Sequence, residues 1–200
     1  MGRKGKRKFF NLFDALATLK TYYKLSDVED IARRYFVIGL FDGVLTSLGV
    51  ITGIWMTKGT KITLLSTILG SGLALSISSA WGAWEAESHE AEIKRKEMEL
   101  KLHRSLKGTL IQKLSTFSIA WTSFVHGVAP LIGILLPVIP FLFSYSYLSF
   151  LLSIIIGFLL LFITGLVMGK ISKQNVIVSG LRMVFAGLIT FIITYFLGIH

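Results

Sequence analysis

Five apolar stretches of membrane length constrain the fold of this 200-residue chain more than any other feature. About 20 apolar residues are enough for a helix to cross a hydrocarbon layer of roughly 30 Å. The chain cannot leave backbone groups unpaired in lipid, so we expect an all-α membrane protein with five transmembrane helices. The predicted spans are residues 35–57, 62–84, 114–143, 147–169 and 176–198.

The basic residues predict how these helices are oriented. Of the 21 Lys and Arg residues, nine lie in residues 1–34, seven in 94–113 and two in 170–175. The positive-inside rule then places the N-terminus in the cytoplasm and the C-terminus outside. We expect a basic, amphipathic N-terminal segment at 1–34 and a transmembrane domain at 35–200.

The composition indicates which partners and which metal sites such a protein can have. The net charge of +10 follows the predicted topology, so anionic lipid of the bilayer is a better partner than nucleic acid, for which the chain has no motif. Residues 9–24 form an amphipathic pattern that either lies on the inner leaflet or packs against the ends of the spans. The absence of cysteine excludes disulfides and thiolate metal sites. A multi-pass protein of a cell membrane is the simplest expectation.

Asp42 is the residue most indicative of function, because a carboxylate inside an apolar span is costly. Arg182 lies at a similar depth in the fifth span, so the alternative is a structural ion pair that neutralises both charges. His126 in the third span is either a packing residue or a ligand and proton relay. Gly39 with Gly43 has the spacing of a close helix contact, which predicts a central or dimer-forming helix.

A charged helix is predicted at 85–113, and its acidic residues are candidate metal ligands. Glu85, His89 and Glu92 share one helical face, and Glu87 lies near the predicted membrane surface. The alternative is a solvated helix, since Glu90 precedes Lys94 at the favourable spacing of four residues. We find no nucleophile–base pair or phosphate-binding loop, which argues against an enzyme and against a resident cofactor.

Three segments resemble the vacuolar iron transporter family, which includes yeast-type iron and manganese transporters and prokaryotic members. The matching segments are residues 42–46 with Gly53 (Asp-Gly-Val-Leu-Thr), residues 137–141 (Pro-Val-Ile-Pro-Phe) and residues 180–198 of the last span. The resemblance implies a five-helix protomer, usually a homodimer, that moves Fe(II) or Mn(II) out of the cytosol in exchange for protons. Asp42 matches the carboxylate to which the family's metal binding and proton coupling are ascribed.

The chain also departs from the family pattern. Ser79 and Ala83 stand where many members carry methionine and glutamate in the second span. We therefore expect Asp42 to be the intramembrane ligand and proton acceptor, with Glu85, Glu87, His89 and Glu92 at the cytoplasmic entrance. The alternative function is a membrane protein that does not transport, in which Asp42 pairs with Arg182 and the charged helix docks a cytoplasmic partner.

Overall fold

The computed structural model describes residues 28–198, which form helices connected by short turns. Each of the five helices is long and apolar enough to cross a membrane, as predicted. The predicted segment at 9–24 and the first residues of the N-terminal segment lie outside the described residues. The helices are α2 (Val28–Met56), α3 (Lys61–Leu102), α4 (Leu110–Phe143), α5 (Tyr147–Ile171) and α6 (Val176–Leu197).

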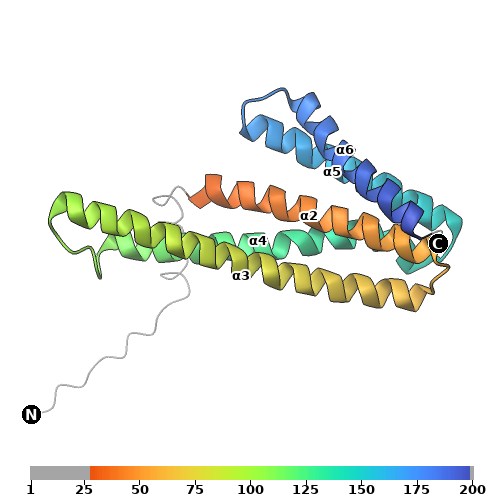
Figure 1. Ribbon diagram of the computed structural model, residues 1–200, viewed down its shortest axis with the longest axis horizontal. Helices are drawn as coiled ribbons and strands as arrows, with labels where there is room; N and C mark the ends of the chain where they lie inside the picture. Colours follow the sequence, from red (N-terminus) through yellow and green to blue (C-terminus); the bar gives the residue numbers. More distant parts are fainter. Residues whose placement is uncertain (1–27, 199–200) are drawn as a thin grey trace, which may run out of the picture.

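Helix α2 is the centre of the bundle and contacts all four other helices. It lies beside α3 and α4, and the α5–α6 hairpin packs on its other side (Figure 1). We call the end that contains the start of α2 and the 103–109 and 172–175 turns the basic end. Figure 1 shows the α3–α4 hairpin extending past the start of α2 there, while the α5–α6 hairpin diverges from α2.

The charged segment at 85–113 is not a separate helix, contrary to the prediction. Helix α3 continues from the second span to Leu102, because no glycine or proline follows Gly82 within it and Glu–Lys pairs support its outer turns. The helix ends at His103, whose backbone is left-handed (φ 50°), and Gly108 is also left-handed (φ 74°). The remaining residues of the segment form this turn and the first turn of α4.

The three prolines of the third span do not break it. Pro130, Pro137 and Pro140 all lie inside α4, which continues to Phe143. Each proline removes one backbone donor, but the helix packs against α2 and α3 along this length. Helix α4 is therefore continuous through all three prolines, and its last turn ends where the backbone N–H of Ser144 bonds to the carbonyl of Pro140.

The main apolar core lies at the end of the bundle opposite the basic end. There the ring of Trp55 stacks on Phe150 at a centroid distance of 5.1 Å. Tyr145 donates a hydrogen bond to the carbonyl of Gly59, which ties the 144–146 turn to the α2–α3 turn. The buried members of this core are Ile51, Leu64, Ile68, Ile134, Val138, Phe141 and Phe150.

Candidate functional site

Asp42 lies in the middle of α2, and its side chain is half-buried. Its backbone carbonyl accepts a hydrogen bond from the Thr46 hydroxyl at 2.8 Å, which is an ordinary contact within a helix. Among residues 28–198, no group lies within hydrogen-bonding or ion-pair distance of its carboxylate. The carboxylate is thus available to an ion or a proton.

The backbone of α2 approaches α4 closely on both sides of Asp42. A Cβ atom at Gly43 would overlap the backbone of Pro130, and one at Gly133 would overlap the backbone of Leu40. Glycine permits this crossing because it has no side chain to separate the helices. The predicted close approach at Gly39 and Gly43 is therefore confirmed, and within the described chain α4 is the helix that makes it.

His126 lies on α4 opposite the turn of α2 that precedes Asp42. Its Nδ1 atom is 2.8 Å from the backbone carbonyl of Tyr35, and so donates a hydrogen bond to it. The same Nδ1 would be 3.0 Å from a Cβ at Gly39. Because Nδ1 carries the proton in this contact, the other ring nitrogen is the one with a free lone pair when the ring is neutral. His126 is thus oriented and not only packed.

Tyr35 connects this crossing to α3. Its hydroxyl donates a hydrogen bond to Oε1 of Glu87 at 3.0 Å, and its ring meets that of His126 edge-on at 5.0 Å. Tyr35 therefore holds one group on α3 and one on α4 from its place on α2. The sequence offered no signal for this contact, since 52 residues separate Tyr35 from Glu87.

A cavity of about 450 Å³ lies at the basic end between α3 and α4, and it includes one residue of α2, Ile31. Of the acidic residues that line this cavity, Glu87 lies nearest to the membrane-spanning part of α3. We call this space the basic-end cavity. Its other lining residues are Ser88, Glu90, Ala91, Glu92, Lys94, Arg95, Met98, Ile111, Gln112, Leu114, Ser115, Thr116, Ser118 and Ile119.

The candidate metal ligands on the acidic face of α3 mostly contact other side chains. Glu85 contacts His89 at 3.1 Å, whereas Arg95 donates hydrogen bonds of 2.7 Å to both oxygens of Glu92. These bonds hold the pKa of the Glu92 carboxyl below its ordinary value. Within residues 28–198, no three acidic or histidine side chains converge as metal ligands. Glu85, Glu87, His89 and Glu92 therefore bind other protein groups or face solvent separately.

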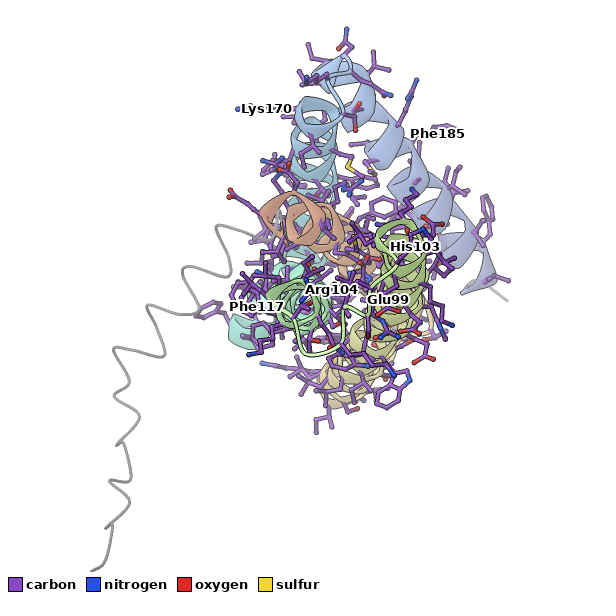
Figure 2. All side chains as sticks on the ribbon, turned by 90° about the vertical axis from the view of Figure 1, so that its left-hand side faces the viewer. Glu99, His103, Arg104, Phe117, Lys170 and Phe185 are labelled. Carbon is purple, nitrogen blue, oxygen red and sulfur yellow. The ribbon has the colours of Figure 1, made fainter. Side chains whose placement is uncertain are left out.

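Figure 2 looks at the basic end. Glu99, His103 and Arg104 gather at the α3–α4 turn, where Glu99 accepts a hydrogen bond of 2.7 Å from the backbone of Leu106. Lys170 lies apart from them, on the α5–α6 hairpin. The charged residues labelled in Figure 2 thus lie on two different hairpins, α3–α4 and α5–α6.

Comparison with known proteins identifies the family. The family model described as the VIT family matches residues 102–199. An uncharacterised protein of Methanocaldococcus jannaschii is 35% identical over 165 residues, which are 81% of this chain and 86% of that protein. The chain belongs to the VIT family, the vacuolar iron transporters. Membership suggests a transporter of metal ions rather than an enzyme, and the five apolar helices make it a multi-pass membrane protein.

Two positions where this VIT-family chain departs from the common pattern lie on α3. Ala83 is 3% exposed, and Ser79 is half-buried. Neither offers the carboxylate or thioether that many members carry there. The acid nearest to Ala83 on the same face is Glu87, one helical turn closer to the basic end.

The ion pair between Asp42 and Arg182, which the sequence left open as an alternative, is not present in this VIT-family protein. The ion pairs of the described residues lie in the first turns of α2 and in the outer part of α3, and none includes Asp42 or Arg182. Arg182 is exposed on α6, where its long side chain can extend toward the nearby basic end. The two charges do not meet because the Arg182 side chain is exposed, whereas the next residue, Met183, packs toward the buried cluster around Val44.

Proposed function

We propose that this protein transports a divalent metal ion, Mn(II) or Fe(II), out of the cytosol in exchange for protons. The observation that carries the proposal is the half-buried Asp42 carboxylate, which makes no hydrogen bond or ion pair with another of the described residues. An acid inside a membrane span is rare and marks an ion or proton pathway by default. Carboxylate oxygen is a suitable ligand for Mn(II), and an imidazole nearby suits Fe(II).

The two ends of the bundle differ in structure, and this difference supports transport out of the cytosol. The basic-end cavity lies at the end that the positive-inside rule assigns to the cytoplasm, whereas aromatic and aliphatic side chains fill the opposite end. A cytosolic ion could thus enter the cavity, while passage to the far side would require the apolar core around Phe141 to open. This difference between the two ends supports a transporter that is open toward the cytoplasm.

The number of ligands that Mn(II) requires supports a homodimer. Mn(II) prefers about six oxygen ligands, and the described residues of one chain supply a single carboxylate at the level of Asp42. A second copy would supply a second Asp42. Water and backbone carbonyls would complete the coordination, and among these the carbonyl of His126 lacks its usual helical donor because Pro130 has no N–H.

Proton exchange follows from the chemistry of a single carboxylate. A metal ion binds the deprotonated form, so metal and proton compete for Asp42. Protonation from the far side would release the metal, and loss of that proton to the cytosol would restore the site. No other acid in the described membrane part of the chain is available for this exchange, since the acids beyond it lie at the basic end.

Flux into proteoliposomes tests the proposal. We would measure Mn(II) and Fe(II) entry under an imposed pH gradient, with the wild type and with Asp42→Asn, which keeps the size of the side chain. We expect flux that requires both the gradient and Asp42. Wild-type rates from Asp42→Asn would show that Asp42 is structural. No flux of either metal from folded protein would favour the function in which the charged end of α3 docks a cytoplasmic partner.

A further inference from the structure

The basic-end cavity has an apolar lining although it lies at the membrane surface. Along α3 it extends from Glu87 to Met98, beyond the second span predicted at 62–84, on the hairpin that extends past the start of α2 (Figure 1). Contact between water and apolar side chains is unfavourable, so an apolar cavity at this level indicates a docking site. Its apolar lining residues are Ile31, Ala91, Met98, Ile111, Leu114 and Ile119.

The chain enters α2 at the edge of this cavity. Val28, the first residue of α2, is fully buried, and Ile31 lines the cavity one helical turn later. Residues 25–27 alone separate the amphipathic pattern at 9–24 from Val28. Tyr23 therefore lies within roughly 17 Å of Val28 even if the linker is fully extended. Such a short tether gives a segment an effective concentration on the order of millimolar at a neighbouring site.

The pattern at 9–24 has the apolar face that this cavity requires. At helical spacing, one side of the segment carries Phe9, Leu12, Phe13, Leu16, Leu19 and Tyr23. The cavity volume of about 450 Å³ is within the range of roughly 300–1,000 Å³ that encloses organic groups in proteins. Several of these side chains can therefore enter the cavity together.

Charge also favours this occupant. Lys20 follows Leu16 by four residues, so it lies on the same helical face as the apolar side chains. Three carboxylates line the cavity against two basic side chains. A cationic residue on the docked face thus complements the cavity. The acidic lining residues are Glu87, Glu90 and Glu92, and the basic ones are Lys94 and Arg95.

We propose that the apolar face of residues 9–24 docks in the basic-end cavity and closes its mouth. The competing partner for this face is the inner leaflet of the membrane. The cavity is favoured because it offers apolar lining and carboxylates together, within reach of the tether. The inference concerns the two parts of one chain and does not depend on transport.

Cysteine pairs test this contact in the full chain, which has no cysteine of its own. The first change is Leu12→Cys, Leu16→Cys or Leu19→Cys in turn, and the second is Ser115→Cys in the cavity lining. Lys113→Cys replaces the second change in the control, because Lys113 lies on the same turn of α4 but does not line the cavity. Under mild oxidation in nanodiscs, we expect at least one leucine position to link to Ser115→Cys about fivefold more than to Lys113→Cys. Mass spectrometry of the linked peptides quantifies both.

Thiol labelling tests whether the segment closes the cavity. Ser118→Cys places a single reporter in the cavity lining. We expect Leu16→Asp to speed its labelling by an impermeant reagent about tenfold, since the docked face loses one apolar side chain. Thr18→Asp is the matched control, because it adds the same charge on the opposite face of the segment. Its labelling rate should stay within about twofold of the reporter alone.

Three results would overturn the inference. One is the absence of preferential linking at every leucine position, and another is equal labelling of the reporter in Leu16→Asp and Thr18→Asp. Links that join two chains into a covalent dimer would assign the contact to a second copy. A nitroxide at position 16 that meets oxygen more often than a water-soluble nickel complex would place the segment in the inner leaflet instead.

Discussion

The Tyr35 hydroxyl on α2 donates a hydrogen bond of 3.0 Å to the Glu87 carboxylate on α3. The backbone carbonyl of the same tyrosine accepts a hydrogen bond of 2.8 Å from His126 on α4. One residue of α2 therefore connects the three helices that line the basic-end cavity. The structure supports five predictions.

Gly43 should not tolerate a methyl group, whereas Gly82 should. A Cβ at Gly43 would overlap the backbone of Pro130, but one at Gly82 would meet no atom within 4 Å. We expect Gly43→Ala to destabilise the protein by about 1–3 kcal/mol or more through overpacking. Gly82→Ala should be neutral or stabilise it by up to about 1 kcal/mol. Thermal unfolding in detergent measures both, and equal melting temperatures would contradict the close α2–α4 crossing.

Asp42 and Arg182 should behave as independent residues. They form no ion pair, and Arg182 is exposed on α6. In a double-mutant cycle with Asp42→Asn and Arg182→Gln, we expect the effects on stability to add within about 0.5 kcal/mol. If the double variant were clearly more stable than the sum of the single changes predicts, the two charges would be paired after all.

The low pKa of Glu92 should depend on Arg95. Their hydrogen bonds lower the pKa of Glu92 from its ordinary value of 4.5. Because the folded-state pKa is the lower one, the pair stabilises the protein above that ordinary value and loses this effect as the pH falls through the folded-state pKa. NMR titration of labelled glutamate should show the pKa rising toward 4.5 in Arg95→Gln. Lys94→Gln is the control, since Lys94 pairs with Glu90.

Tyr145→Phe should destabilise the protein by about 1 kcal/mol, the usual value of one hydrogen bond. The Tyr145 hydroxyl bonds to the carbonyl of Gly59, and burial raises the pKa of this phenol, which therefore stays protonated as a donor at neutral pH. Tyr147→Phe is a matched control because Tyr147 is 64% exposed. Equal unfolding temperatures of the two variants would show that the bond to Gly59 contributes nothing.

The two ends of the bundle should lie on opposite sides of the membrane. A single cysteine at Gly108 in the α3–α4 turn should react with an impermeant thiol reagent only after cells are opened. A cysteine at Lys58 in the α2–α3 turn should react in intact cells, because the positive-inside rule places the basic end in the cytoplasm. The reverse pattern would invert the proposed direction of transport.

Features that belong to a single helix could be predicted from the sequence, whereas contacts between helices could not. Three predictions depend on one helix at a time: the five spans, the position of Asp42 in the first span, and the glycine spacing at Gly39 and Gly43 that permits a close approach. The separate helix at 85–113 was wrong because the composition changes at Trp84 while the helix does not end. The alternative pair of Asp42 with Arg182 does not form because equal depth in two spans does not bring two side chains together.

Sequence alone determined that this chain crosses a membrane five times and keeps a carboxylate inside it, because the cost of polar groups in lipid acts on each segment separately. Only the tertiary structure decided what surrounds that carboxylate. Which helices cross at Gly43, which carboxylate Tyr35 holds, and where the basic-end cavity stops all depend on how side chains from α2, α3 and α4 meet. Such contacts between distant segments are set by packing in three dimensions, which no pattern along one helix encodes.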